Sequence, residues 1–330
     1  MNFHGKRVFV TGAGGFIGSH LVERLVQDGA RVRAFVHYNS GDRWGNLELL
    51  QNDILAEIEV VAGDITDPFS VKKSMTNCSV VFHLAALIGI PYSYTAPQSY
   101  VMTNIVGSMN VLEACINTGV EKVIHTSTSE VYGSALYTPI DERHPLQGQS
   151  PYSASKIGAD KIAESYYRSF GLPLAIVRPF NTYGPRQSAR AIIPVIISQL
   201  LARKSCIKLG SLEPIRDFTY ISDTVNGFLA VGMSEKTPGE VVNIGSGEAI
   251  SIGNVANMIM EIVGMSAEIV TEKERMRPEK SEVTELICSN AKARDICNWK
   301  PECSLREGLS KTIDSIGRNM DRFKTDRYAV

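Results

Sequence analysis

Short apolar runs alternate with longer stretches of helical periodicity through the first half of this 330-residue chain. The apolar runs are nearly continuous, so the strands that they predict should be covered on both faces, as in a parallel sheet with crossover helices. The pattern therefore predicts a doubly wound, Rossmann-like α/β fold. The predicted strands are residues 8–10, 32–36, 58–62, 80–84, 122–125 and 174–177.

Two long helices are predicted between these strands, at about residues 99–118 and 153–170, in addition to a first helix at about 16–28. In each long helix one apolar face is expected to cover the sheet. A second apolar face would let two subunits pair as a helix bundle, so a homodimer is expected. The apolar residues at helical spacing are Ile105, Met109, Leu112 and Ile116, then Ile157, Ala163 and Tyr167.

After Pro179 the alternation loosens, and the pattern predicts helices at 191–202, 222–233, 251–263 and 305–320, with short strands at 207–209 and 241–244. The strand at 241–244 is expected to return to the main sheet, which would make the second domain discontinuous in sequence. We therefore expect a cofactor domain at residues 1–180, together with about 222–250, and a smaller C-terminal substrate domain at 181–330.

The bulk composition narrows the possible partners. A formal net charge of −1 argues against a nucleic-acid or membrane surface. No apolar run reaches membrane-spanning length and no signal peptide is evident at the N-terminus, so a cytoplasmic protein is expected. The six cysteines form no Cys-x-x-Cys pair, and no His, Cys or Asp cluster has metal-ligand spacing. Reduced thiols and no metal are therefore expected.

A glycine-rich segment follows the first strand and opens the first helix. Gly12, Gly15 and Gly18 lie three residues apart, and Phe16 and Ile17 begin the helix. Glycines at this spacing permit a tight turn, close approach of a pyrophosphate and close packing of helix on strand. The helix N-terminus adds free amides for the anion. An isolated glycine triplet is often only a turn, but its place between a strand and a helix predicts a dinucleotide site.

The end of the second strand should select the nicotinamide cofactor. An acidic residue there would bind the ribose of NAD, but this chain has His37 and no carboxylate before Asp42. Arg43 follows, and it would either meet a ribose phosphate or be solvated. On the residues alone, the choice between NAD and NADP stays open.

The ends of the next two strands are expected to line the same cofactor. Asp64 and Ile65 follow the third strand, and Leu84, Ala85 and Ala86 follow the fourth. In a parallel sheet these strand ends lie along one edge, where the adenine and the pyrophosphate would bind. The alternative is that they are ordinary strand ends.

A tyrosine and a lysine lie one helical turn apart at Tyr152 and Lys156. A free phenol has a pKa of about 10, too high for a base at neutral pH. A nearby ammonium and a positive nicotinamide both favour the phenolate, which can take a hydroxyl proton. The spacing is common by chance, but it gains weight from the hydroxyls of Ser127, Thr128 and Ser129, one crossover earlier.

Glu130 follows those hydroxyls directly. A carboxylate beside a hydride-transfer site could remove the proton next to a newly formed ketone and drive elimination of water. Without that base, the same groups would only oxidise or epimerise a sugar alcohol. The alternative role for Glu130 is structural, as a carboxylate bonded to nearby amides.

Four residues are candidates for binding an anionic substrate. The amide of Asn181 could donate to a diphosphate or a sugar hydroxyl, and guanidinium groups match phosphate oxygens in shape. Each arginine considered alone is more often a solvated surface charge. The candidate arginines are Arg190, Arg216 and Arg277, the last within the Arg-rich stretch 273–278.

These motifs together resemble the extended short-chain dehydrogenase/reductase superfamily, and the likeness extends over most of the chain. The motifs are the glycine triplet, Thr128-Ser129-Glu130, Tyr152-x-x-x-Lys156 and residues 178–185. The Thr-Ser-Glu triplet resembles nucleotide-sugar 4,6-dehydratases, especially the GDP-mannose type. Sugar 4-epimerases typically have no glutamate there, and dTDP-glucose dehydratases usually have Thr-Asp-Glu.

Residues 35–40, 145–151, 184–190 and 277–281 further resemble the UDP-N-acetylglucosamine 4,6-dehydratases of legionaminic acid synthesis. The resemblance implies a nucleotide-sugar substrate and tightly held NAD, although NADP is not excluded. It also implies a phosphate contact for Arg216, and Ser93 is a candidate contact for an acetamido group. A 4-epimerase, a GDP-sugar 4,6-dehydratase and a non-catalytic nicotinamide-binding regulator are the alternatives.

The resemblance implies a defined order of steps. Tyr152, helped by Thr128 and Lys156, would deprotonate the hydroxyl on carbon 4 while hydride passes to the nicotinamide. Glu130 would then remove the proton on carbon 5, and hydroxide would leave carbon 6, protonated by Ser129 or by Glu130. The stored hydride then returns to carbon 6 and a proton to carbon 5, so water is lost and no cofactor is consumed.

Overall fold

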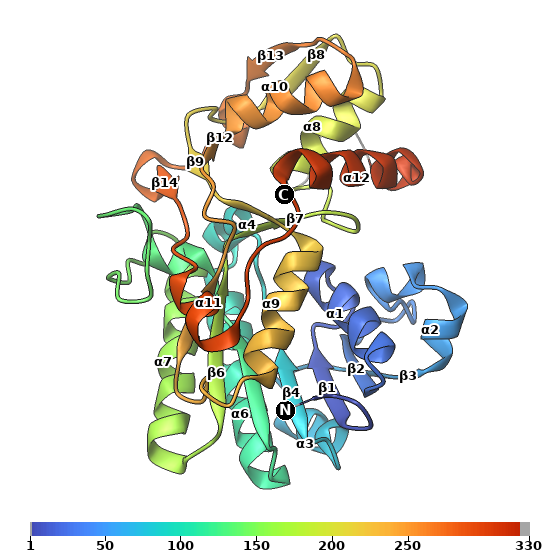
Figure 1. Ribbon diagram of the computed structural model, residues 1–330, viewed down its shortest axis with the longest axis vertical. Helices are drawn as coiled ribbons and strands as arrows, with labels where there is room; N and C mark the ends of the chain where they lie inside the picture. Colours follow the sequence, from blue (N-terminus) through green and yellow to red (C-terminus); the bar gives the residue numbers. More distant parts are fainter. Residues whose placement is uncertain (1, 324–330) are drawn as a thin grey trace.

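The computed structural model describes residues 2–323. Met1 and residues 324–330 lie outside this range; they belong to the outer ends of the two expected domains. Its centre is a seven-stranded parallel sheet with helices on both faces, which confirms the predicted Rossmann-like fold (Figure 1). The strand order is reversed between β1 and β4, and ligands of such sheets bind at that point, outside the carboxyl ends of the strands. In spatial order the strands are β11 (Val241–Ile244), β6 (Leu174–Pro179), β5 (Lys122–Thr126), β4 (Val80–His83), β1 (Arg7–Thr11), β2 (Arg31–His37) and β3 (Ile58–Gly63).

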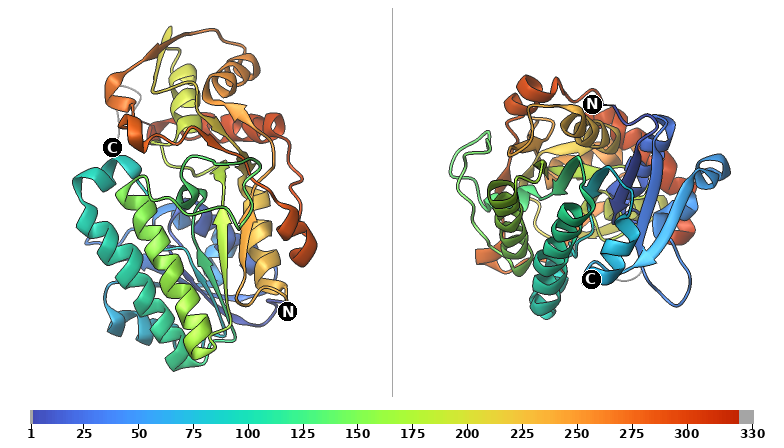
Figure 2. Two further views of the ribbon diagram at one scale, coloured as in Figure 1. Left: turned by 90° about the vertical axis from the view of Figure 1, so that its left-hand side faces the viewer. Right: turned by 90° about the horizontal axis from the view of Figure 1, so that it is seen from below.

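Alternate residues of the strands face two different helical layers. In β1, Val8 and Val10 belong to one buried cluster and Phe9 to another, because successive side chains point to opposite faces. This arrangement explains why the central positions of β1 are apolar on both faces. One layer contains α1 (Phe16–Gln27) and α9 (Ile221–Met233), and the other α3 (Pro68–Met75), α6 (Gly107–Thr118) and α7 (Pro151–Phe170). Figure 2 shows α6 and α7 side by side on the outer surface.

The helix predicted at 99–118 is interrupted in the structure. It comprises α5 (Pro97–Tyr100), a π-helical segment η2 (Val101–Val106) and α6. Within η2, the buried side chain of Asn104 accepts from the amide of Leu87 at 2.8 Å and donates to its carbonyl at 2.9 Å. These bonds tie the helix to the loop after β4. Such π segments are common at functional sites, and the apolar periodicity of the sequence contains no sign of this one.

Much of the chain after β6 packs on the carboxyl ends of the main strands, while α9, β11 and α11 (Ala291–Cys297) lie in or against the main sheet (Figure 1). β11 pairs in parallel with β6, as predicted for residues 241–244, and α11 contacts β11 and α9. The boundaries of the two expected domains stay a prediction. The remaining elements are α8 (Ile192–Leu201), α10 (Ile252–Val263), α12 (Leu305–Gly317), β7 (Asn181–Tyr183), β8 (Cys206–Leu209), β9 (Ile215–Arg216), β10 (Phe218–Tyr220), β12 (Ile250–Ser251), β13 (Glu268–Thr271) and β14 (Glu285–Leu286).

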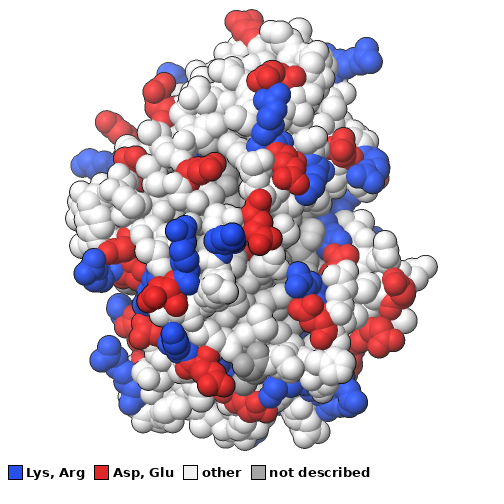
Figure 3. Space-filling view, viewed as in Figure 1, with Lys and Arg blue, Asp and Glu red and all other residues white. Residues whose placement is uncertain are grey.

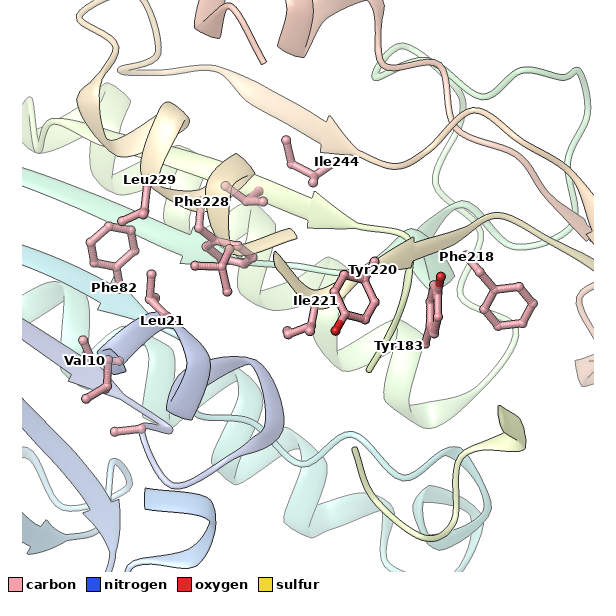
Figure 4. Close-up of a cluster of buried hydrophobic side chains, with 14 of the residues drawn as sticks. Val10, Leu21, Phe82, Tyr183, Phe218, Tyr220, Ile221, Phe228, Leu229 and Ile244 are labelled. Atoms are coloured by element: carbon pink, nitrogen blue, oxygen red, sulfur yellow. The ribbon is translucent and has the colours of Figure 1, made fainter. Parts of the chain in front are cut away.

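One hydrophobic core extends through both halves of the chain. Val10 of β1, Phe82 of β4 and Phe228 of α9 belong to the same buried cluster as Tyr183 of β7 and Phe218 of β10 (Figure 4). The cofactor side and the substrate side therefore share their packing. As a result, residues from distant parts of the sequence are held in fixed positions around the strand ends.

Basic and acidic side chains are interspersed over the face of the molecule in Figure 3. Between residues 2 and 323, none of the helices is long and apolar enough to cross a membrane. The same range contains no group of three or more His, Cys, Asp or Glu side chains that could hold a metal ion. All six cysteines are free thiols.

Candidate active site

A cavity of about 1020 Å³ lies at the carboxyl ends of the main strands, under the C-terminal half. Ligand sites commonly have volumes of about 300–1,000 Å³, so this cavity can hold more than one small molecule. Its wall joins the glycine-rich loop to residues of β5, α7, β7 and β9. The fold therefore brings the predicted cofactor and substrate residues into one space.

The glycine-rich loop is packed too closely for side chains. A Cβ on Gly18 would lie 2.2 Å from the carbonyl oxygen of Gly12, and a Cβ on Gly12 would lie 2.7 Å from the amide nitrogen of Ala85. Gly12 also has a φ of +70°, which other residues adopt only with strain. Gly15 caps α1 without a side-chain hydrogen bond. The first amides of α1 are thus available to a pyrophosphate, and the residues present fit a dinucleotide.

The side chain of Arg43, after β2, is held by a carboxylate. Its Nε and Nη2 atoms donate to Glu48 at 2.9, 3.0 and 2.6 Å. The backbone carbonyl of Arg43 accepts from the side chain of Asn39, which together with His37 lines the cavity. The positive charge that an additional ribose phosphate would need is therefore already paired.

Tyr152 and Lys156 both line the cavity from α7, and both are buried. Burial raises the pKa of Tyr152 above its ordinary value of 10, a hydrogen bond with Thr128 acts in the opposite direction, and the charge of Glu130 adds to the rise. Burial also lowers the pKa of Lys156 to about 8, against the opposing charge of Asp160. The phenol of Tyr152 is therefore neutral in this structure, and the added positive charge of a bound nicotinamide would favour the phenolate.

The helix that carries these two residues is anchored at its start. Ser150 and Ser153 form a capping box at the N-terminus of α7. Asn104 donates to the hydroxyl of Ser155 at 2.9 Å, and that hydroxyl donates to the carbonyl of Tyr152 at 2.7 Å. The ammonium of Lys156 donates to the carbonyl of Thr126, at the end of β5, at 2.7 Å. The π segment, β5 and α7 are thus tied together around the tyrosine.

Asp160 lies one turn beyond Lys156 on the same face of α7, and its role was not predicted from the sequence. It is fully buried and accepts from Arg178 at 3.0 and 3.2 Å and from Ser127 at 2.8 Å. Burial raises its pKa, but the His125 imidazole, 3.5 Å away, and the charges of Arg178 and Lys156 outweigh that effect and hold the pKa at about 2. The network links β5, β6 and α7 directly behind the site.

We expect Asp160→Asn to lower the free energy of unfolding by about 3–5 kcal/mol, because the buried guanidinium of Arg178 would lose its charge partner. Urea unfolding measures this change. Asp28→Asn is the matched control, because it removes the carboxylate of an exposed pair with Arg24 and should cost less than about 1 kcal/mol. Equal losses in the two variants would contradict the role of Asp160.

The same carboxylate predicts an acid dependence. The pKa of Asp160 is lower in the folded protein than its ordinary value of 3.8, so the stability that it contributes is complete above about pH 4. That contribution is lost as the pH falls towards about 2. Asp160→Asn should therefore unfold with a weaker pH dependence over this interval.

Glu130 lies in a 3₁₀ turn, η3 (Ser129–Tyr132), that follows β5 and is capped by Thr128. Its carboxylate borders the cavity and lies 3.5 Å from a guanidinium nitrogen of Arg277. Arg277 also lies 3.9 Å from Glu282, which in turn lies 3.4 Å from Arg216. Glu282 was not predicted from the sequence, although residues just before it belong to one of the stretches that resemble dehydratases.

All but two of the predicted site residues line this cavity. Ser129 is buried and is not part of the cavity wall. Ser93, in the short helix α4 (Ile90–Thr95), is fully buried, and its hydroxyl donates to the carbonyl of Ile90 at 2.7 Å. The residues in the wall are Gly12, Gly15, Phe16, Ile17, Gly18, His37, Asp64, Ile65, Leu84, Ala85, Ala86, Thr128, Glu130, Tyr152, Lys156, Asn181, Arg190, Arg216 and Arg277.

Comparison with known proteins identifies the family. A family model described as GDP-mannose 4,6 dehydratase matches residues 9–312. The chain belongs to this family of nucleotide-sugar dehydratases and epimerases. The curated dTDP-glucose 4,6-dehydratase of Streptomyces antibioticus is 32% identical over 311 residues, which cover 93% of this chain and 91% of that protein.

Solved structures of the family include both reaction types. The dTDP-glucose 4,6-dehydratase DesIV of Streptomyces venezuelae, solved with NAD bound, has a TM-score of 0.87 at 26% identity and covers 96% of this chain and 99% of its own. The UDP-glucuronic acid 4-epimerase of Bacillus cereus, in complex with UDP-glucuronic acid and NAD, has a TM-score of 0.85 at 31% identity, with coverage of 95% and 99%. Family membership therefore leaves dehydration and epimerisation to be distinguished by the site.

Proposed function

We propose that this protein is a nucleotide-sugar 4,6-dehydratase that converts UDP-N-acetylglucosamine to the UDP-4-keto-6-deoxy sugar. The observation that carries the proposal is the carboxylate of Glu130 in the same cavity wall as Tyr152 and Lys156. Oxidation and epimerisation at carbon 4 need the tyrosine and the cofactor but no second base. Loss of water across carbons 5 and 6 needs a group that takes the proton from carbon 5.

NAD is the cofactor, as in the solved relatives, and when bound it takes the hydride from carbon 4 and returns it to carbon 6. The free amides at the start of α1 and the close glycine packing fit its pyrophosphate. The pairing of Arg43 with Glu48 supports NAD over NADP, because the additional phosphate of NADP would have to displace a carboxylate held by short, forked hydrogen bonds of 2.6–3.0 Å.

The roles of the chain's own residues follow from their positions. Tyr152 takes the proton of the hydroxyl on carbon 4, aided by Thr128 and by the positive charge of Lys156. Glu130 takes the proton from carbon 5. It also protonates the hydroxide that leaves carbon 6, because Ser129 does not line the cavity. A proton that comes from solvent returns to carbon 5 when the hydride returns to carbon 6.

The nucleotide diphosphate is assigned to Arg190, Arg216 and Arg277, with Asn181 donating to a phosphate or a sugar hydroxyl. These four residues line the part of the cavity formed by β7, β9 and the segments after β7 and β13. Ser93 has no part in this proposal, because its hydroxyl is bonded within α4.

The choice of UDP-N-acetylglucosamine is supported by two stretches that resemble the corresponding dehydratases. Residues 145–151 and 277–281 meet in the structure, where the hydroxyl of Ser281 donates to the carbonyl of Gln149 at 2.6 Å. Tyr94 bonds the same hydroxyl at 2.6 Å. The two stretches therefore contact each other close to Arg277, the member of the second stretch that lines the cavity.

A homodimer through α6 and α7 belongs to the same proposal. These helices lie side by side at the surface (Figure 2), and apolar side chains on and just before them are exposed. Burying them against a second copy would remove apolar area from water, which is the main driving force of association. The exposed residues are Val101, Met102, Met109, Ile116 and Phe170.

The decisive experiment is mass spectrometry of products from a panel of UDP- and GDP-sugars incubated with the NAD-loaded protein. We expect UDP-N-acetylglucosamine to give a product lighter by one water. An epimerase would give a product of unchanged mass, and a non-catalytic protein would give none. Either result, or water loss from the GDP-sugar alone, would contradict the proposal.

A further inference from the structure

Four charged side chains form a chain of ion pairs inside the cavity. Glu130 contacts Arg277 at 3.5 Å, Arg277 lies 3.9 Å from Glu282, and Glu282 contacts Arg216 at 3.4 Å. All four line the cavity wall, and the side chain of Arg216 is only 6% exposed. Two carboxylates thus balance two guanidinium groups, as buried charges require.

The two ends of this series of ion pairs differ in how firmly their side chains are held. Glu282 also accepts the backbone amide of Val283 at 3.2 Å, and Arg216 donates to the carbonyl of Ile215 at 2.9 Å. This end is fixed to the backbone. The side-chain contacts are long at both ends, 3.5 Å for Arg277–Glu130 and 3.4 Å for Arg216–Glu282, against about 2.7–2.9 Å for a usual charge-assisted hydrogen bond, so the difference between the ends lies in these backbone bonds. Arg277 can therefore exchange its partner at modest cost.

A diphosphate entering this space would change the balance of charge. It brings two or more negative charges and offers guanidinium groups shorter, forked hydrogen bonds than a carboxylate at 3.5 Å. Burial lowers the pKa of Arg277, but the charges of Glu130 and Glu282 outweigh this effect, so the group is a full cation. One guanidinium thus faces two competing anions, the base and the substrate.

We propose that the diphosphate of the nucleotide sugar draws Arg277 away from Glu130, so that binding of the correct substrate frees the base. Arg216 and Glu282 stay in place as the fixed part of the phosphate site. This inference rests on the proposed function, because it assigns the diphosphate to Arg277 and the carbon 5 proton to Glu130. Without a diphosphate, the carboxylate stays in contact with the guanidinium of Arg277.

The proposal makes an unusual prediction about the base itself. Since Glu130 competes with the ligand for Arg277, Glu130→Gln should bind a nucleoside diphosphate more tightly than the unchanged protein does, by roughly 5- to 10-fold. The gain should require Arg277. In the Arg277→Gln background, adding Glu130→Gln should leave the affinity within about twofold.

Isothermal titration calorimetry of the NAD-loaded protein measures the affinity for a nucleoside diphosphate and so tests this prediction. The ligand is UDP or GDP, whichever the unchanged protein binds more tightly. Four proteins complete the cycle: unchanged, Glu130→Gln, Arg277→Gln and both together. Glu213→Gln is the control, because it removes an exposed carboxylate three residues from Arg216 that does not line the cavity. Glu130→Ala provides a second variant with the same expected sign if the glutamine variant fails to fold.

The outcomes separate the competing explanations. Tightening that needs Arg277 supports the exchange of partners. Tightening that persists without Arg277, or that Glu213→Gln reproduces, would mean simple charge repulsion and would overturn the proposal, as would no tightening. The affinities are measured without turnover. A failed dehydration assay would therefore refute the proposed function, whereas the competition of Glu130 and the diphosphate for Arg277 is tested by the affinities alone.

Discussion

Glu130→Gln is expected to lower the rate of water loss by at least about 100-fold, the lower end of the usual contribution of a general base. The amide has nearly the shape of the carboxylate but cannot accept the proton from carbon 5. Tyr152, Thr128 and Lys156 are unchanged in this variant, so oxidation at carbon 4 should continue. We therefore expect reduced nicotinamide to accumulate while no dehydrated sugar forms.

Two measurements on the same samples check this prediction. Absorbance of the reduced nicotinamide follows the oxidation, and mass spectrometry of a reaction in heavy water follows deuterium at carbon 5 together with loss of water. Glu213→Gln is the matched control and should behave as the unchanged protein does. Near-normal dehydration by Glu130→Gln, or deuterium in its product, would show that another group is the base.

The main sheet was predictable because its strands are buried on both faces. A strand such as β1 must be apolar along its centre, Val8 to Val10, to pack against α1 on one side and α3 and α6 on the other, and this requirement leaves a continuous apolar run in the sequence. The glycine triplet and the spacing of Tyr152 and Lys156 are equally local. Each depends on a few neighbouring residues in one element, so the sequence alone predicts it.

The features that were not predicted depend on contacts between distant segments. Asn104, within the π segment, bonds to Leu87 and Ser155, and neither bond is evident from the apolar periodicity of the sequence. Asp160 lies four residues after Lys156 on α7, and this helical spacing could have marked it as a neighbour of the site. Its partner Arg178, however, is on a different element, strand β6. Glu282 could be recognised only once Arg216 and Arg277 were brought together.

Ser93 shows a second limit of prediction from sequence. It follows a strand of the sheet, as binding residues often do, but Pro91 begins a short helix in which the hydroxyl of Ser93 bonds back to Ile90. Serine side chains commonly bond to a carbonyl three or four residues earlier in a helix. The direction of a single side chain in a short helix depends on that local bond, which the sequence pattern does not reveal.

Tyr152→Phe is expected to abolish oxidation and dehydration together, with a loss of about 100- to 10,000-fold. Phenylalanine keeps the packing of the ring, which lies edge-on to Tyr100 at 6.3 Å between centroids, so the fold should be retained. Without the hydroxyl, the proton on the oxygen of carbon 4 has no acceptor. This variant should form no reduced nicotinamide, which distinguishes it from Glu130→Gln.

The unchanged protein should also show a pH dependence that this variant lacks. Burial raises the pKa of Tyr152, so its phenol stays protonated at neutral pH. The fraction of phenolate increases as the pH rises, and the oxidation step should therefore accelerate towards alkaline pH. Tyr166→Phe, on the same helix with its hydroxyl bonded to Glu113 at 3.2 Å, is the control and should keep both the rate and the profile. Reduction of nicotinamide by Tyr152→Phe at a rate near that of Tyr166→Phe would mean that another group accepts the proton. Thr128, whose hydroxyl is bonded to Tyr152, would then be the next candidate.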